Sequence, residues 1–300
     1  MANYITMSSL GRCGRFANQV IQYAFLRVYA LQHDLTVQNA PWVGEELFGI
    51  RPAPVTVKLP QYAEPHEGGV RPTALPDIRA VNRDFSGWAQ YHTSFYRPHK
   101  KFLQGLFRPV IEIRQRMDMA VRRLGFQGRT RVGVHLRRGD YGQREFYITP
   151  VDWYLNWLDV NWMDLNDPVL FVASEDKSLV DEFADYDPQT TESLGVDLEA
   201  KPLRTYNYLA RDLETREPHL LDFVPDWYLL TQCEYVLMPN STFSFAAAMM
   251  SRRLQHAFRS DLPTQRFKEI DVWDTTPMTY ELAEDFRHVP GVCLAENPHW

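Results

Sequence analysis

The stretch that decides the fold is VGVHLRRGDY, residues 132–141. Its apolar first half predicts a buried β-strand from Val132 to Leu136, and the glycine at position 139 ends that strand. The two-residue period of a strand places His135 and Arg137 on one face, and Arg138 on the other face with the apolar side chains. Because ligands of open parallel sheets bind outside the carboxyl ends of the strands, we expect the Arg137 guanidinium to be free there for a diphosphate.

Arg138, on the inner face, needs a partner, because a buried cation is unfavourable unless it is paired. Asp140 is near enough in the sequence to be that partner. Arg138 is therefore interpreted either as a ligand contact or as one half of an Arg138–Asp140 ion pair that shapes the loop. The sequence leaves both interpretations open.

Strand and helix patterns alternate on both sides of this stretch. Downstream they predict a helix from Pro150 to Leu158 with Thr149 as its N-cap, then a strand over 169–173, a helix over 226–235, a strand over 236–238 and a helix over 243–252. Upstream, a strand over 4–7, a helix over 18–32 and a strand over 35–38 form a βαβ unit. The buried face of its helix is marked by Val20, Ala24, Val28 and Leu31. The alternation is typical of α/β proteins with parallel sheets.

Three hundred residues are enough for two domains. We predict an N-terminal α/β domain over residues 1–128, on the acceptor side, and a C-terminal Rossmann-like domain over residues 129–300. A helix over 110–124 that stops at Gly125 comes just before this boundary. The proline-rich residues 51–80 are predicted to form an irregular insertion.

Composition excludes several classes of protein. With 45% apolar and 23% charged residues the chain is globular, and no apolar run approaches the roughly 18 residues that span a bilayer. The net charge of −6 argues against a general nucleic-acid binder, although residues 101–150 carry eleven cations and four acids. The three cysteines lack disulfide or zinc spacing, and the first residues do not resemble a signal peptide. We therefore expect a cytoplasmic protein without an integral membrane segment.

Two further loops have the chemistry of an anion site. Residues 11–19 (GRCGRFANQ) open the first predicted helix, and residues 239–248 (PNSTFSFAAA) lead from a strand into a helix of small residues. Loop amides and a helix N-terminus bind phosphate in many proteins. The first loop is equally compatible with an ordinary tight turn. In the second, Ser241 or Thr242 is expected to cap the helix, which is compatible with phosphate binding.

Together the three segments resemble a known family. Residues 135–141 (HLRRGDY) resemble the HxRRGDY signature of the α1,2-fucosyltransferases and, more distantly, of the α1,6- and protein O-fucosyltransferases. Residues 14–24 are similar to that family's G-x-x-N-Q-x-x-Q-Y-A, with one extra residue between Gly14 and Asn18. Residues 240–244 match its NSTFSWW motif, but Phe245 and Ala246 replace the two tryptophans. Weaker likeness at residues 87–91 (GWAQY) and 171–176 extends the resemblance over most of the chain.

The resemblance implies an α/β, GT-B-like fold of two facing Rossmann-like domains and an inverting transfer of L-fucose from GDP-β-L-fucose, without a metal or other cofactor. The partners it implies are the nucleotide sugar and a glycan acceptor, with an α1,2 linkage to galactose favoured. It makes Arg137 the catalytic diphosphate ligand. The donor-binding residues it implies are Gly14, Arg15, Asn18, His135, Arg138, Asp140, Ser174, Asp176, Asp226, Asn240, Ser241, Thr242 and Phe243.

Within this set, Asp226 is expected to read guanine, because one carboxylate can accept both N1–H and the exocyclic amine of that base. Glu175 stands where the family has an aspartate, and its role stays open. The general base for the acceptor also stays open, since nothing in the spacing separates the candidates Glu45, Glu46, Asp84 and His92.

Other functions are weighed against this one. Asp185-Tyr186-Asp187 has the letters of a metal-binding DxD motif, but it lies in a segment so acidic that the match is expected by chance. A histidine phosphohydrolase places its arginine before its histidine, whereas His135 precedes Arg137 here. A fucosyltransferase with another linkage or acceptor, and a non-catalytic GDP-sugar-binding or glycan-binding module, remain as alternatives.

Overall fold

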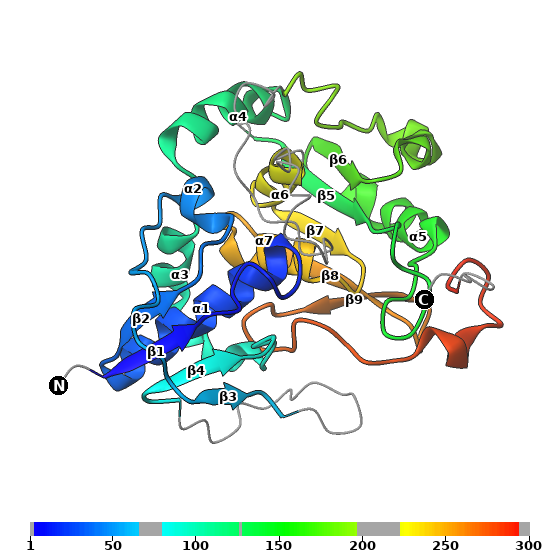
Figure 1. Ribbon diagram of the computed structural model, residues 1–300. Helices are drawn as coiled ribbons and strands as arrows, with labels where there is room; N and C mark the ends of the chain where they lie inside the picture. The colour runs from blue at the N-terminus through cyan, green and yellow to red at the C-terminus, as the bar shows by residue number, and fades with distance from the viewer. Residues whose placement is uncertain (1–2, 66–79, 126–127, 197–222, 294–300) are drawn as a thin grey trace. The chain divides into compact units, whose positions relative to one another are not determined.

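The computed structural model describes residues 3–65, 80–125, 128–196 and 223–293. The chain divides into two compact units. Of the described residues, unit 1 comprises 3–65, 80–115 and 273–277, and unit 2 comprises 116–125, 128–196, 223–272 and 278–293. Each unit has its own parallel sheet with helices packed on it, as the α/β prediction required (Figure 1). The boundary predicted between residues 128 and 129 follows helix α4 (Ile111–Arg123), whereas the division of the units falls within that helix.

Unit 1 contains a four-stranded sheet in the order β2-β1-β4-β3, in which every pair is parallel. Its strands are β1 (Tyr4–Met7), β2 (Thr36–Asn39), β3 (Gln61–Ala63) and β4 (Arg83–Ser86). The prediction for residues 4–7 is confirmed, and the strand predicted over 35–38 is shifted by one residue. The proline-rich segment is not wholly irregular, since β3 lies within it. Its three residues carry no strand pattern of their own, and their pairing with β4 makes them a strand.

Helix α1 (Phe16–His33) packs on this sheet, and thirteen of its eighteen residues are buried, which confirms the predicted buried helix. Leu31 is an error of the prediction, because its side chain is 54% exposed. The last turn of α1 is exposed throughout, so the helix extends past the surface that it packs against. The core beneath α1 is aromatic, with the rings of Phe25 and Phe85 4.5 Å apart and those of Phe25 and Tyr91 5.5 Å apart.

The remaining helices of unit 1 are short. They are α2 (Gly44–Phe48), the 3-10 turns η1 (Thr93–Phe95) and η2 (Arg97–His99), and α3 (Lys100–Leu106). Residues 273–277 belong to unit 1 although they come late in the chain. Thr93 anchors them, since its backbone N–H donates to the carbonyl of Thr275 at 2.7 Å and its hydroxyl accepts from the N–H of Thr275 at 3.0 Å.

Unit 2 contains a five-stranded sheet in the order β6-β5-β7-β8-β9. Its strands are β5 (Thr130–Leu136), β6 (Pro168–Ser174), β7 (Tyr235–Met238), β8 (His256–Asp261) and β9 (Arg266–Ile270). All neighbours are parallel except β8 and β9. The three strands predicted over 132–136, 169–173 and 236–238 are confirmed as β5, β6 and β7. Gly125 follows α4 with a φ of 84°, as expected of a residue that ends a helix in the left-handed region.

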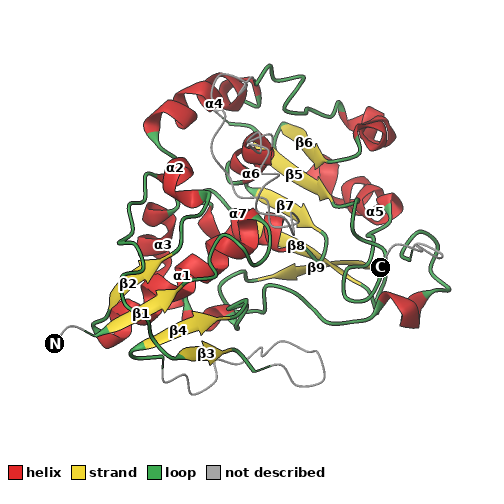
Figure 2. Ribbon diagram, in the orientation of Figure 1, coloured by secondary structure: helices red, strands yellow, loops and turns green. Residues whose placement is uncertain are grey.

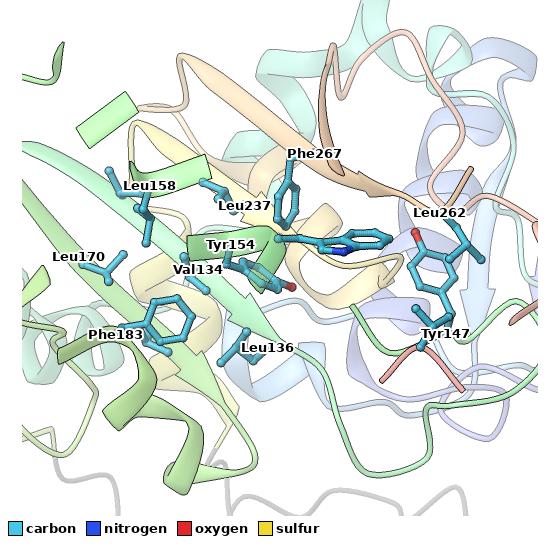
Figure 3. Close-up of a cluster of buried hydrophobic side chains, with 14 of the residues drawn as sticks. Val134, Leu136, Tyr147, Tyr154, Leu158, Leu170, Phe183, Leu237, Leu262 and Phe267 are labelled. Carbon is cyan, nitrogen blue, oxygen red and sulfur yellow. The ribbon is translucent and has the colours of Figure 1, made fainter. Parts of the chain in front are cut away.

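The two faces of β5 pack against different helices (Figure 2). Its alternate residues Val132, Val134 and Leu136 join a hydrophobic core with α5 (Val151–Asn161), which includes Tyr154 and Leu158 (Figure 3). The opposite face meets α6 (Phe223–Leu230) and, through His135, the first turn of α7 (Thr242–Met250). The contact with α6 is close at Gly133, where an added Cβ would lie 3.0 Å from Cδ2 of Leu230.

Three helix predictions need correction at their ends. Thr149 is not the N-cap of α5, because that position is Pro150, and the buried Thr149 hydroxyl instead donates to Oγ of Ser260 at 3.0 Å. Helix α6 ends at Leu230, well before the predicted end, because the chain must turn to enter β7. Helix α7 spans Thr242–Met250 instead of 243–252. Among the described residues, none of the helices combines the length and apolar character that a bilayer span requires.

Candidate functional site

The sheet of unit 2 has a switch point between β5 and β7. From β5 the chain crosses through α5 to β6 on one side, and it then returns through α6 to β7 on the other side of β5. In open parallel sheets, ligands bind at the carboxyl ends of the strands where the order reverses in this way. The loops after β5, β6 and β7 all begin at this edge. Together with the strand ends and the helix start that flank them, they carry ten of the fourteen site residues predicted from the sequence.

Arg137, the first residue after β5, is held by two carboxylates. Its Nη2 donates to Oδ1 of Asp140 at 2.6 Å, and its Nη1 forms an ion pair with Glu175, the first residue after β6. The guanidinium carbon lies 5.2 Å from the ring centre of Tyr141. The expectation that the guanidinium is free therefore needs correction. Gly139, with a φ of 63°, turns the chain so that Asp140 comes back to Arg137 and not to Arg138.

Arg138 lies on the other face of the strand end, as the strand period predicted. Its Nη1 donates to the carbonyl of Arg137 at 2.9 Å, and its backbone N–H donates to Oε2 of Glu175 at 3.2 Å. Burial lowers the pKa of the Arg138 guanidinium, while the neighbouring Tyr154 and Asp176 oppose that shift. The carboxylate near the Arg138 side chain is thus that of Asp176, in the loop after β6.

His135 is a buried neutral imidazole. Its Nδ1 lies 2.8 Å from Oγ of Ser244, and its ring centre lies 5.1 Å from that of Phe243. Burial, reinforced by the positive charges of Arg137 and Arg138, lowers its pKa to about 3. An uncharged ring cannot act as a cation for phosphate at neutral pH, so its observed contacts join β5 to the first turn of α7.

The N-terminus of α7 brings backbone amides to the same edge. Ser241 is its N-cap, and the hydroxyl of Ser241 accepts from the N–H of Phe243 at 3.3 Å, as expected. Thr242 is the first helical residue. The partial positive charge of a helix N-terminus favours a bound anion at this position.

Asn240 is fully buried, and its side chain crosslinks three loops. Its Nδ2 donates to the carbonyls of Glu145 and Thr279, each at 2.9 Å, and its Oδ1 accepts from the N–H of Thr279 at 2.8 Å. The amide is occupied by these contacts. The geometry therefore gives Asn240 a structural role at the base of the loop.

The two residues predicted at the end of β6, Ser174 and Asp176, are engaged in a local turn. The Ser174 hydroxyl donates to the carbonyl of Asp176 at 2.9 Å, and Asp176 caps the 3-10 segment η4 (Lys177–Tyr186) by accepting from the N–H of Ser178 at 3.1 Å. Asp226, in the first turn of α6, accepts from the hydroxyl of Thr191 at 3.1 Å. Because α6 leads back into β7, its first turn lies at the carboxyl edge of the sheet.

The predicted residues Gly14, Arg15 and Asn18 belong to unit 1. Arg15 is the N-cap residue of α1, without a side-chain cap, and Gly14 has a φ of 77°. The amides of α1 tie two loops together. The Gln19 side chain donates to the carbonyl of Gly14 at 3.0 Å, the Gln22 side chain donates to those of Cys13 and Gly87, and Asn18 accepts from Gln90 at 2.7 Å.

Sequence reasoning missed Glu64. Its carboxylate is 4% exposed and accepts the backbone N–H groups of Trp88 and Ala89, at 2.8 and 3.1 Å. It follows directly after β3, inside the segment predicted to be irregular. The only signal in the sequence was its carboxylate in a stretch of weak pattern, and such a signal does not distinguish it from other acids.

The four candidates for a general base differ in their surroundings. Asp84 already accepts three hydrogen bonds, from the hydroxyl of Thr6 and from the hydroxyl and N–H of Ser8, at 2.6–2.9 Å. Burial raises the pKa of the Glu45 carboxyl, whereas Glu46 is exposed. Nδ1 of His92 lies 2.8 Å from Oγ of Ser94. Across the described ranges, no three carboxylate, histidine or cysteine groups gather as a metal site would require.

Two Rossmann-like units, each built on a sheet of mainly parallel strands, match the GT-B fold of glycosyltransferases. Solved structures with this fold are similar to the chain. They include NodZ α-1,6-fucosyltransferase soaked with GDP-fucose, at 15% identity and a TM-score of 0.51 over 89% of this chain and 99% of that one. The fucosyltransferase NodZ from Bradyrhizobium has 15% identity and a TM-score of 0.52, over 90% and 99%.

A mutant of Arabidopsis thaliana FUT1 in complex with GDP is also similar, at 12% identity and a TM-score of 0.56, over all of this chain and 81% of that one. At these identities the likeness establishes the fold. No family model matches the chain, and no curated protein matches it.

Proposed function

We propose that the protein is a glycosyltransferase that moves L-fucose from GDP-β-L-fucose to a glycan hydroxyl with inversion, most closely an α1,2 transfer to galactose. The observation that carries the proposal is the position of Arg137 at the switch point of a Rossmann-like unit, beside the N-terminus of α7. The comparisons support the proposal, because the similar GT-B structures are fucosyltransferases. They include an α-1,6 enzyme and complexes with GDP or GDP-fucose.

The proposed reaction requires positive charge next to the β-phosphate of the leaving GDP. When GDP leaves the anomeric carbon, negative charge builds on the β-phosphate, and preorganised donors that face this charge lower the barrier. The Arg137 guanidinium and the partly positive N-terminal end of α7 are the groups we assign to it. They supply positive charge from the protein itself, so the proposed reaction needs no metal.

Asp226 is proposed to recognise the guanine ring of the donor nucleotide. A carboxylate at the first turn of α6 can accept both N1–H and the exocyclic amine of guanine, which no other common base offers together. Ser174 and Asp176 at the carboxyl end of β6, and Arg138 with Asp140, are proposed to shape the walls of the donor site. Gly14, Arg15 and Asn18 are proposed as donor contacts from unit 1.

The test is transfer without metal. The purified protein is incubated with GDP-fucose and EDTA, and panels of galactosides, glucosaminides and glycopeptides are screened for a fucose mass increment. Arg137→Ala should lower the rate by 10²-fold or more, because one such donor is worth roughly 3–4 kcal/mol. Arg129→Ala is the matched control, because Arg129 pairs with Asp167 next to the opposite, amino end of the strands.

The outcomes separate the alternatives. Unchanged turnover in Arg137→Ala contradicts its assignment, and activity only after metal addition contradicts the metal-independent mechanism. A product with another linkage keeps the donor site but changes the acceptor. Tight GDP binding without transfer or donor hydrolysis favours a binding module.

A further inference from the structure

The loop Gly87–Tyr91, directly after β4 in unit 1, is fixed by buried side chains from three other segments. Glu64 accepts the N–H groups of Trp88 and Ala89, at 2.8 and 3.1 Å. The Tyr96 hydroxyl donates to the carbonyl of Ala89 at 2.7 Å, and the Gln22 amide donates to that of Gly87 at 3.1 Å. Glu64, Tyr96 and Gln22 are each at most 4% exposed, so the loop is held from beneath by groups shielded from water.

This loop has an unusual backbone. Ala89 has a φ of 54°, in the left-handed region that residues with a Cβ rarely adopt. A Cβ added at Gly87 would lie 2.5 Å from Cβ of Glu64, so only glycine fits there. Strained backbone of this kind persists where the surroundings over-determine it, and it gathers at functional sites.

The side chain that this loop presents is Trp88. It is partly exposed, and its indole lies against the Gly11–Arg15 loop, because a Cβ added at Gly14 would come within 2.7 Å of Cζ3 of Trp88 and of Nδ2 of Asn18. Gly14 itself has a φ of 77°. The Trp88 ring and the Asn18 side chain therefore both approach Gly14, where the loops after β1 and β4 come together.

A rigid indole next to an amide suits a sugar ring. The face of an aromatic ring carries negative charge density and attracts the partly positive C–H groups on one face of a pyranose, while neighbouring amides satisfy its hydroxyls. The contacts beneath the loop fix the backbone that carries the ring, and this lowers the entropic penalty of binding.

We propose that Trp88 is the platform on which a sugar ring of the acceptor glycan stacks, and that Glu64 is the positioning residue that fixes it. This inference rests on the proposed function, since it gives unit 1 the acceptor of that reaction. It assigns the acceptor subsite to the loop after β4, and it makes the acceptor a glycan that offers an apolar pyranose face.

The test compares Trp88→Ala and Trp88→Phe with Trp162→Ala, which removes a partly exposed tryptophan that packs against Tyr186 in unit 2. In Trp88→Ala the KM for the acceptor should rise about tenfold, and in Trp88→Phe about threefold, because a phenyl ring keeps part of the stacking. The KM for GDP-fucose and the hydrolysis of GDP-fucose without acceptor should stay within about twofold of the wild type.

Glu64 is tested by rescue. Glu64→Ala should raise the KM for the acceptor, and Glu64→Gln should restore part of the loss because it keeps one accepting oxygen. Thermal unfolding of each variant identifies any that fail to fold. In a folded Trp88→Ala or Trp88→Phe variant, an unchanged KM for the acceptor overturns the proposal, and so does a loss confined to the KM for GDP-fucose.

A second measurement separates this inference from the function beneath it. N-acetyllactosamine is titrated into the protein without nucleotide, and indole fluorescence is followed in the wild type and in Trp88→Phe. A quench that Trp88→Phe abolishes and Trp162→Ala retains supports the platform even if no fucose is ever transferred, and in that case only the proposed function falls. Fucose transfer by a protein whose fluorescence and acceptor KM are insensitive to Trp88 leaves the function standing and overturns the platform.

Discussion

Oδ1 of Asp140 accepts a 2.6 Å hydrogen bond from Nη2 of Arg137, three residues earlier in the chain. The contact is local to the loop after β5, and it orients one edge of the guanidinium whatever else binds there. The second carboxylate on Arg137 differs in kind, because Glu175 comes from the loop after β6 and its side chain is 42% exposed. Asp140 thus orients the arginine, whereas Glu175 competes with an incoming anion for it.

Glu175→Gln should therefore strengthen nucleotide binding. Removing one negative charge from a partly exposed pair changes the binding free energy by about 1 kcal/mol, so the Kd for GDP should fall about fivefold in calorimetry. Glu182→Gln, an exposed acid of η4, is the control for net charge alone. Weaker binding in Glu175→Gln would mean that Glu175 helps to position Arg137 and does not compete for it.

His135 should make folding stability depend on pH. Its pKa is about 3 in the folded protein and about 6.5 in the unfolded chain, so between these values the unfolded state binds more protons. The stability that the neutral His135 contributes is fully present above pH 6.5 and is lost as the pH falls toward 3. At pH 5 the loss is about 2 kcal/mol.

Urea unfolding at pH 7.5 and at pH 5 measures this effect. His135→Asn should lose less stability on acidification than the wild type does, by about the same 2 kcal/mol. His256→Asn, at a partly exposed histidine, is the control. Equal acid sensitivity of the wild type and His135→Asn would show that His135 is not the neutral buried group.

Glu45 should act as the base if the acceptor is deprotonated from unit 1. Loss of a general base lowers kcat by about 10²-fold or more, so Glu45→Gln should do so with little change in either KM. Glu46→Gln, at the exposed neighbour on α2, should be near wild type. Burial raises the pKa of Glu45, so wild-type kcat should rise with pH through a value above the ordinary glutamate range. That acidic limb should vanish in Glu45→Gln, and its persistence would assign the base elsewhere.

Glu234 should be a strong determinant of the stability of unit 2. It pairs with the 2% exposed Arg131, whose backbone N–H and Nε both donate to Oε2 of Glu234 at 3.0 Å. Glu234→Ala leaves a buried arginine without this carboxylate and should lower the free energy of unfolding by about 3–5 kcal/mol in urea titrations. Asp167→Ala, which breaks the surface pair with Arg129, should change it by about 1 kcal/mol or less. Equal effects of the two substitutions would contradict this difference.

Local order along the chain was readable from the sequence alone. The strand at residues 132–136, the buried helix after Gly14 and the cap at Ser241 follow from apolar periodicity, glycine and hydroxyl placement, which act over a few residues. The positions of His135 and Arg137 on one strand face follow in the same way. Short β3 could not be predicted, because three residues of weak pattern become a strand only through their pairing with β4.

Tertiary structure alone decided which side chains meet. The turn at Gly139 brings Asp140 to Arg137, and strand order places Glu175 on the same guanidinium. The Asn240 side chain crosslinks its loop to Thr279, 39 residues later in the chain. Glu64 holds the backbone of Trp88, which is 24 residues away. Hydrogen bonds and ion pairs depend on distances of a few ångströms between segments remote in sequence, and only the folded packing sets those distances.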